Sequence, residues 1–265
     1  MNRKGVAELA GSVGLGAWTA FGVLAMVVVG GHGAPLYLDD GLLHWSVEHR
    51  PEIAIAVARG VTATGTGVIP YALVVLAWLI AGRTARQRLA AVLLAALCLG
   101  AGQAVRYGVM ELVGRARPAE SDWQTHASGW SFPSGHSTTA ALTAGLVILA
   151  IAVRAPRGRL PLCLAVGCWG ALVGLTRVFL GVHWFTDVIG GWLFAVGWLG
   201  VCLCAAAWWL PGRLVPGAGK QARATGAANR TTPPAGIPHP TDPATTPQED
   251  HAPQDPGRRG RSRPA

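Results

Sequence analysis

The chain has 265 residues, of which 51% are hydrophobic and only 13% are charged, and its mean hydropathy is +0.37. Soluble domains usually carry about a quarter charged residues, so this composition argues against an ordinary soluble domain and indicates an integral membrane protein. The net charge of +9 is compatible with nucleic-acid binding, but the basic residues lie in short clusters between apolar runs rather than along one face. That distribution favours positively charged cytoplasmic loops, and we expect no nucleic-acid partner.

Six apolar runs in the chain predict its fold class. They cover residues 13–29, 61–81, 89–113, 136–153, 160–180 and 187–210. Each run is close to the roughly twenty residues that a helix needs to cross a bilayer. The sequence therefore predicts an all-α integral membrane protein with six transmembrane helices. Basic residues precede the first run, which we expect to be an uncleaved membrane helix, with a secretory signal peptide as the alternative.

Two other regions differ from these runs. Residues 32–61 mix acidic, basic and histidine residues with Trp45, and we expect an external loop with a short amphipathic helix on the membrane surface. Residues 213–265 are rich in Pro, Thr and Arg and nearly lack large apolar side chains. Such a segment cannot bury enough surface to fold, so the sequence predicts a disordered cytoplasmic tail. We therefore divide the chain into a membrane domain, residues 1–212, and this tail.

The basic clusters predict the topology. They lie at residues 3–4, 83–88 and 154–159 and from 213 onward, which all fall on one side when six helices are counted. Because basic loops stay in the cytoplasm, we expect a multi-pass protein of the plasma (inner) membrane with both termini cytoplasmic. The remaining loops, and the candidate active site with them, then face outside.

Two histidines and an aspartate at the edges of the later runs indicate chemistry on a phosphate. His183 is a candidate nucleophile, and Asp187 lies one helical turn further on, where it can orient the imidazole ring. His136 is the candidate acid that protonates the leaving oxygen. A single histidine at a membrane edge is more often an interfacial residue, so the hypothesis depends on the joint pattern.

Further residues near these three are suited to holding the phosphate. Arg117 and Arg177 carry planar guanidinium groups that can bind phosphate oxygens in pairs. Ser134 and Gly135 stand where a helix begins, and the free backbone N–H groups of a helix start favour an anion. The histidines and cysteines show no spacing typical of metal ligands, and we expect no metal and no cofactor.

These residues form three motifs that resemble the signature of the type 2 phosphatidic acid phosphatase family (PAP2), the superfamily of lipid phosphate phosphatases and haloperoxidases. The family pattern is Lys-x6-Arg-Pro, Pro-Ser-Gly-His and Ser-Arg-x5-His-x3-Asp. The matching residues here are Met110-x6-Arg117-Pro118, Pro133-Ser134-Gly135-His136 and Thr176-Arg177-x5-His183-x3-Asp187. The resemblance covers roughly residues 35–205.

The resemblance implies a PAP2-like helical bundle that hydrolyses a lipid phosphate or diphosphate without a metal, through a phosphohistidine on His183. Asp187 would orient His183, and His136 would protonate the leaving group. Phosphate binding would fall to Arg117, Ser134, Gly135 and Arg177. Undecaprenyl diphosphate, phosphatidic acid and phosphatidylglycerol phosphate are the substrates that the resemblance brings in, and the residues do not choose among them. Membrane lipids are the other expected partner.

The first motif departs from the family pattern, because Met110 replaces its lysine and removes a cation. Arg106, one turn earlier on the same helix face, is one candidate replacement, although helical side chains tilt towards the helix N-terminus and so away from the site. Arg115 in the following loop is the other. Losing one charge-assisted contact costs on the order of 1.5–3 kcal/mol, so we expect a slower or more selective phosphatase rather than an inactive one.

Two alternatives from other functional classes stay open. Met110 favours a non-catalytic relative that binds lipid phosphates, whereas the intact histidines and aspartate favour an enzyme. A membrane transporter is the second alternative, in which Arg106 and Glu111 would line a pathway. Release of phosphate with and without His183→Ala distinguishes an enzyme from a binder, and flux measurements in vesicles test a transporter.

Overall fold

A computed structural model describes residues 3–154 and 158–209 of the chain. Within these ranges the regular structure is helical, without strands, which confirms the predicted all-α class. The helices are α1 (Arg3–Gly30), α2 (Tyr37–Glu48), α3 (Glu52–Ala63), α4 (Val68–Ala81), α5 (Ala85–Val113), the short 3-10 helix η1 (Glu120–Asp122), α6 (Gly135–Arg154), α7 (Leu160–Phe179) and α8 (Phe185–Trp209). The tail predicted at residues 213–265 lies outside the described residues.

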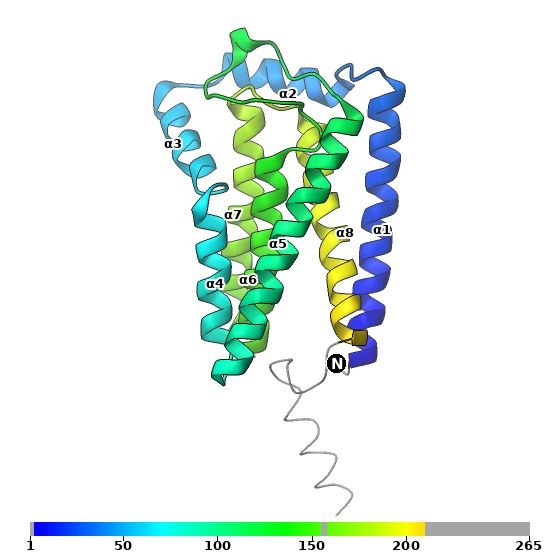
Figure 1. Cartoon of the computed structure of the whole chain (residues 1–265). Coiled ribbons are helices and arrows are strands. Elements are labelled where there is room, and N and C mark those ends of the chain that lie inside the picture. The colour runs from blue at the N-terminus through cyan, green and yellow to red at the C-terminus, as the bar shows by residue number, and fades with distance from the viewer. Residues whose placement is uncertain (1–2, 155–157, 210–265) are drawn as a thin grey trace, which may run out of the picture. The chain divides into compact units, whose positions relative to one another are not determined.

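The long helices account for the predicted membrane spans. In the part of the chain that the structure describes, five helices are long and apolar enough to cross a bilayer: α1, α5, α6, α7 and α8. Helices α3 and α4 form a sixth span if they are counted together, with a bend of 55° between them. The protein is therefore a multi-pass membrane protein, and the long helices stand side by side in one bundle (Figure 1).

The second span is where the structure differs from the sequence prediction. A continuous run was expected over residues 61–81, but α3 ends at Ala63 and α4 begins at Val68. The break follows from its glycines: Gly67 has a φ of +68°, which a side chain would strain, and any side chain at Gly65 would overlap Val173 of α7. The break therefore brings the intervening Thr66 into the bundle.

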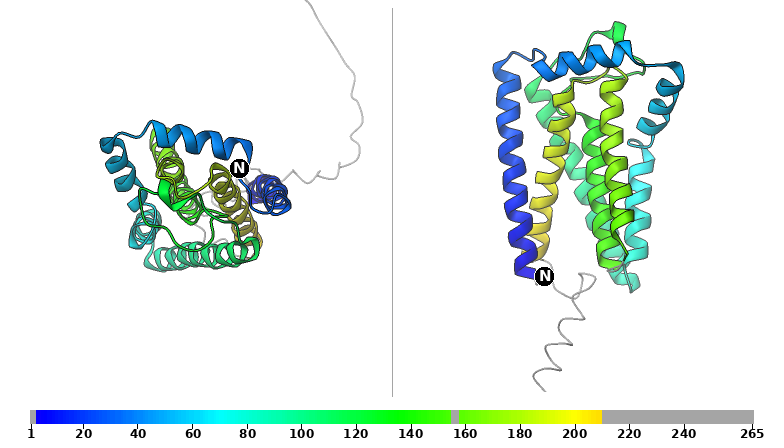
Figure 2. Two further views of the ribbon diagram at one scale, coloured as in Figure 1. Left: turned by 90° about the horizontal axis from the view of Figure 1, so that it is seen from above. Right: turned by 180° about the vertical axis from the view of Figure 1, so that it is seen from behind.

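Helix α2 runs across one end of the bundle, at the end opposite the N-terminus, and the loop between α5 and α6 covers the same end (Figures 1 and 2). Helix α2 corresponds to the short helix that the sequence predicts between the first two spans. Its side chains Leu43 and Ser46 are buried, whereas Tyr37 and Trp45 are exposed. Asp39 is fully buried, and its carboxylate accepts a hydrogen bond from the Leu36 backbone N–H at the start of the helix. Helix α2 therefore directs one carboxylate inwards.

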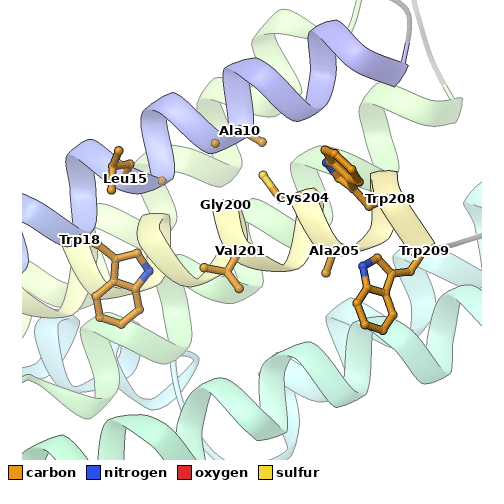
Figure 3. Close-up of a pocket in the computed structure, with 11 residues that line it drawn as sticks. Ala10, Leu15, Trp18, Gly200, Val201, Cys204, Ala205, Trp208 and Trp209 are labelled. Atoms are coloured by element: carbon orange, nitrogen blue, oxygen red, sulfur yellow. The ribbon is translucent and has the colours of Figure 1, made fainter.

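Helices α1 and α8 pack backbone against backbone. A Cβ at Gly200 would lie 2.6 Å from the Cα of Gly14, so only glycine permits this approach. Towards the N-terminal end of α1 the two helices leave an apolar groove of about 460 Å³, bordered by Trp18, Trp208 and Trp209 (Figure 3). Its lining is apolar, as expected between spans surrounded by hydrocarbon.

An aromatic cluster joins α1 and α8 to the loop that enters α6. Phe21 stacks on Phe132 with ring centroids 5.7 Å apart, and Phe194 packs edge-on against Phe21. Trp18 contacts Phe21 and Phe194 from the side. Phe132 directly precedes the Pro-Ser-Gly-His motif and is fully buried, so the packing of this cluster holds the start of that motif in place.

Candidate active site

A cavity of about 630 Å³ lies beneath the loop between α5 and α6. The break between α3 and α4, helix α5, that loop, the start of α6, the end of α7 and the turn before α8 all contribute to its lining. Residues of all three motifs line it together with Arg106: they are Met110, Arg117, Gly135, His136, Arg177 and His183. The structure therefore places residues that are up to 117 positions apart in the sequence, from Thr66 to His183, around one volume.

His183 is held by the carboxylate of Asp187. It lies in the turn between α7 and α8, and its Nδ1 is 3.2 Å from Oδ2 of Asp187 in the first turn of α8. The same carboxylate oxygen accepts the backbone N–H of Trp184 at 2.9 Å. With the Nδ1 proton directed at the carboxylate, Nε2 keeps a lone pair that faces the cavity. This is the tautomer that a nucleophilic imidazole requires.

Burial keeps the His183 ring neutral. The side chain is only 2% exposed, and removal from water lowers its pKa to about 4, although the hydrogen bond to Asp187 raises it. Nearby Arg117 and Arg177 lower it further. At neutral pH the imidazole therefore carries no charge and its Nε2 lone pair is available.

Arg117 is held by the loop that surrounds it. Its guanidinium donates to the carbonyl oxygens of Ser128, Gly129 and Trp130 at 2.8, 2.9 and 3.0 Å. One nitrogen, Nη1, also lies 2.9 Å from Nε2 of His183. Burial lowers the pKa of Arg117, with the charge of Asp187 acting in the opposite direction. The fork is thus fixed beside the atom that would attack phosphorus.

Arg177 enters the cavity from the last turn of α7 with spare hydrogen-bonding capacity. It is 2% exposed, and its Nη1 donates to Thr62 Oγ1 at 3.2 Å. Its Nε has no hydrogen-bond partner among the described residues. A buried guanidinium N–H without a partner is costly, so its position on the cavity wall favours an anionic ligand there.

His136 and Gly135 begin α6 and line the cavity opposite the α3–α4 break. The first backbone N–H groups of a helix have no partner within the helix, and this start is directed at the arginines. Thr66 Oγ1 lies 3.5 Å from Nε2 of His136. Sequence reasoning did not select Thr66, although the glycines on either side of it were a visible signal of a break.

Ser134 has a different place from the one predicted. It is fully buried and does not line the cavity. Its backbone N–H donates to the carbonyl oxygen of Asp187 at 3.0 Å, and its hydroxyl accepts a hydrogen bond from Ser137 at 2.9 Å. In this structure Ser134 therefore connects the second and third motifs, and it does not line the cavity.

Arg106 takes up the space next to Met110. Its Nη1 donates to the Met110 sulfur at 3.3 Å and lies 3.5 Å from the carbonyl oxygen of Pro133. The guanidinium carbon lies 3.9 Å from the centroid of the Tyr107 ring. Because Met110 lies one turn towards the C-terminus, the side chain runs against the usual tilt of helical side chains. Arg106 therefore lines the cavity beside Gly135, which is where a replacement for the missing lysine would have to lie.

Arg115, the other candidate replacement, requires a correction. It is 1% exposed and does not line the cavity. Its Nη1 donates to Asp187 Oδ1 and its Nη2 to Asp39 Oδ2, each at 2.7 Å. Further bonds reach the hydroxyl of Thr186 and the carbonyl oxygens of Gly33 and Ala34. Its donors are thus engaged behind His183 and are not directed at a phosphate.

Three arginines supply the positive charge of the cavity: Arg106, Arg117 and Arg177. Glu111 also lines it, near the side where α5 faces outwards. Within residues 3–154 and 158–209, no three His, Cys, Asp or Glu side chains come together in a way that would hold a metal ion. The arrangement is suited to binding a phosphate through guanidinium groups, with a neutral imidazole positioned to attack it.

Comparison with known proteins agrees with the motifs. The PAP2 superfamily model matches residues 91–211. The chain is 34% identical over 110 residues to phosphatidylglycerophosphatase B of Bacillus subtilis, a match that covers 40% of this chain and 53% of that protein. It is 39% identical over 95 residues to lipid A 1-phosphatase of Rhizobium etli, covering 32% and 37% respectively. The matches thus span about half or less of these relatives.

The fold gives a longer match. The crystal structure of a transmembrane PAP2 type phosphatidylglycerolphosphate phosphatase from Bacillus subtilis superimposes with a TM-score of 0.60 at 25% identity. This match covers 74% of the present chain and 94% of the other. The match of residues 91–211 to the PAP2 superfamily model and this likeness of fold confirm the resemblance that the motifs predict.

Proposed function

We propose that this protein is a membrane phosphatase that removes phosphate from a lipid phosphate or diphosphate through a phosphohistidine on His183. The observation that carries the proposal is the convergence of three buried or half-buried guanidinium groups on the cavity that contains His183 Nε2. Arg177 in particular has a buried N–H that is unpaired within residues 3–154 and 158–209. A phosphoryl group in the cavity would accept a hydrogen bond from this N–H and lie next to the lone pair of Nε2.

In the first step Nε2 of His183 attacks phosphorus. The Nε2–phosphorus bond forms while the bond from phosphorus to the lipid oxygen breaks, and the electron pair leaves with that oxygen. His136 donates a proton to it, which releases the lipid alcohol, or the lipid phosphate from a diphosphate. The Nδ1 hydrogen bond to Asp187 stabilises the positive charge that develops on the His183 ring. Arg117 must release Nε2 as the phosphate binds, since its Nη1 occupies the same lone pair.

In the second step water attacks the phosphohistidine. Its proton passes to His136, which the first step has left neutral, and the Nε2–phosphorus bond breaks to regenerate His183. The arginines hold the equatorial oxygens in both steps, and a cavity shielded from bulk water strengthens each of these contacts. Nothing in this sequence needs a metal, because Arg106, Arg117 and Arg177 would neutralise the phosphate charge.

A lipid substrate fits the position of the cavity. It lies at one end of the spans, and its lining includes Tyr71 and Tyr107, whose side chains are 39% and 57% exposed on the outer sides of α4 and α5. The phosphate of a lipid could therefore enter the cavity while the acyl or prenyl chains stay in the bilayer. The names of the relatives, a phosphatidylglycerophosphatase and lipid A 1-phosphatases, agree with this substrate class.

The cavity end is proposed to face the outside of the plasma membrane. The basic residues between α4 and α5 and those adjoining α6 and α7 gather at the opposite end of the bundle, together with the N-terminus (Figure 1). A cysteine introduced at His126, on the cavity side, should react with a membrane-impermeant maleimide in intact cells. Labelling only after the cells are opened would reverse the orientation.

The enzymatic proposal is tested by phosphate release from phosphatidylglycerol phosphate, phosphatidic acid and undecaprenyl diphosphate in detergent micelles. His183→Ala should lower the rate on the best substrate by about four orders of magnitude, because it removes the nucleophile. His44→Ala, the same exchange at an exposed position of α2, should retain the wild-type rate. Equal rates for wild type and His183→Ala would favour a lipid-phosphate binder instead.

A further inference from the structure

A chain of buried charged groups lies behind His183, on the side away from the cavity. Asp187 faces His183 through Oδ2 and Arg115 through Oδ1, and Arg115 extends to Asp39 through its other terminal nitrogen. The side chains of Asp39, Arg115 and Asp187 are entirely shielded from solvent. Two carboxylates therefore share one guanidinium. One of them, Asp187, is hydrogen-bonded to His183, the proposed nucleophile.

Asp39 binds this chain to helix α2 and to the start of α8. Its carboxylate accepts the backbone N–H of Thr186 at 2.8 Å and the Thr186 hydroxyl at 2.7 Å. Thr186 directly precedes Asp187 and belongs to the first turn of α8, where the helix dipole also favours a carboxylate. Asp39 thus fixes the backbone next to Asp187 while Arg115 fixes its side chain.

The contacts assign each oxygen of Asp187 a separate partner. With Oδ1 held by Arg115, the carboxylate cannot rotate without breaking a short charge-assisted bond at 2.7 Å. Oδ2 is then presented to Nδ1 of His183 in one direction, which aims Nε2 at the cavity. Because Arg115 is divided between two carboxylates, it does not withdraw the whole charge of Asp187 from the imidazole.

We propose that Asp39 and Arg115 are positioning residues for His183, acting through Asp187. This inference rests on the proposed phosphohistidine mechanism and adds two residues to it, one of them from the helix that crosses the end of the bundle. Neither residue touches the substrate, so they govern the attack of Nε2 on phosphorus and leave phosphate binding to the arginines of the cavity.

The test compares two conservative variants with wild type. Arg115→Lys keeps one buried positive charge, but a compact ammonium cannot bridge two carboxylates as the planar fork does. Its rate of phosphohistidine formation and its kcat should fall by about tenfold to a hundredfold, as expected for a misaligned reacting group. KM and the inhibition constant of inorganic phosphate should stay within about twofold of wild type, because the cavity arginines are unchanged. Asp39→Asn, which is nearly isosteric, should change the same quantities in the same direction, but less.

Arg59→Lys is the matched control. Arg59 lies at the same end of the molecule and donates to the carbonyl oxygen of Gln124, outside the buried chain. It should keep the wild-type kcat. Counting active sites from the burst of phosphohistidine separates a slower attack from a loss of folded protein, since a structural role alone would lower the amplitude and not the rate.

The outcomes decide between the two proposals. Folded Arg115→Lys protein with wild-type burst rate and kcat would overturn the positioning role while leaving the phosphatase intact. If Arg115→Lys does not fold, an unchanged burst rate in Asp39→Asn would overturn it equally. Wild-type protein that forms no phosphohistidine and does not differ from His183→Ala would overturn the proposed function, and the inference with it.

Discussion

The two sides of His183 are built in opposite ways. On the Nδ1 side Asp187, Arg115 and Asp39 form a closed set in which each charged group has a charged partner at 2.7 Å. On the Nε2 side Arg177 has a buried N–H for which the part of the chain that the structure describes offers no acceptor. The contrast is between Arg115, whose hydrogen bonds are completed by carboxylates, a hydroxyl and carbonyl oxygens, and Arg177, which keeps a buried N–H for an anion.

The largest expected effect comes from making the same substitution on each side. Arg115→Met leaves Asp39 and Asp187 buried without a counter-charge, which should lower the free energy of unfolding by about 3–5 kcal/mol. Arg177→Met removes a buried charge that has no carboxylate partner among the described residues, so stability should be unchanged or higher by about 1 kcal/mol. Thermal unfolding in detergent measures both, and phosphate release should fall strongly in each.

Arg177→Lys is the control for this pair, because it restores charge without the fork. It should recover part of the affinity for inorganic phosphate that Arg177→Met loses. Equal losses of stability in the two methionine variants would show that both arginines serve the fold, and the contrast between the two sides would then disappear.

Arg106 provides the next largest effect, on the ligand side alone. Arg106→Ala should lower kcat/KM by about tenfold to a hundredfold, the equivalent of one charge-assisted phosphate contact. Adding Met110→Lys to that variant should recover most of the loss, since a lysine at position 110 restores the family pattern. Arg86→Ala, at the exposed opposite end of α5, serves as the control.

Met110→Lys alone separates two explanations of the departure from the pattern. If the missing cation limited catalysis, this variant would raise turnover. The structure instead places Arg106 against the Met110 side chain, so a second cation there should repel it and leave kcat/KM within a few-fold of wild type. A rise of more than tenfold would contradict the view that Arg106 already fills the position.

The pH dependence gives the smallest expected effect. Because burial lowers the pKa of His183 to about 4, the free imidazole is neutral above that pH and becomes protonated only below it. After correction for ionisation of the substrate, kcat/KM should therefore show no loss attributable to His183 as pH falls through 6.5, and should decline as pH approaches 4. A decline centred near 6.5 would show that the ring is not shielded from water in the free enzyme.

Much of the fold was predictable because hydropathy is a local property. The apolar runs gave the all-α class and the places of the long helices, and the three motifs selected side chains that the structure places around one cavity. The bend between α3 and α4 was missed, because residues 61–81 carry no charge and the threonines near the break lower the hydropathy of the run only a little. Only the glycines at positions 65 and 67 marked it.

The role of Arg115 could not be predicted for a different reason. Its partners Asp39 and Asp187 lie 76 and 72 residues away along the chain, and no periodic pattern connects them. From the sequence alone an arginine two residues before Arg117 is an equally good phosphate ligand. Only the folded chain shows that one guanidinium is directed into the cavity and the other away from it.

Helix α1 has a consequence for the chemistry although it contributes no residue to the cavity. Its Phe21 lies flat on Phe132, and Phe132 is the residue on which the Pro-Ser-Gly-His turn rests. A chain shortened by that helix would leave this ring bare on one face and would lose the glycine-to-glycine seam with α8. Deleting the first span should therefore loosen His136 and the start of α6 before it disturbs Arg117 or Arg177, which lie on other elements.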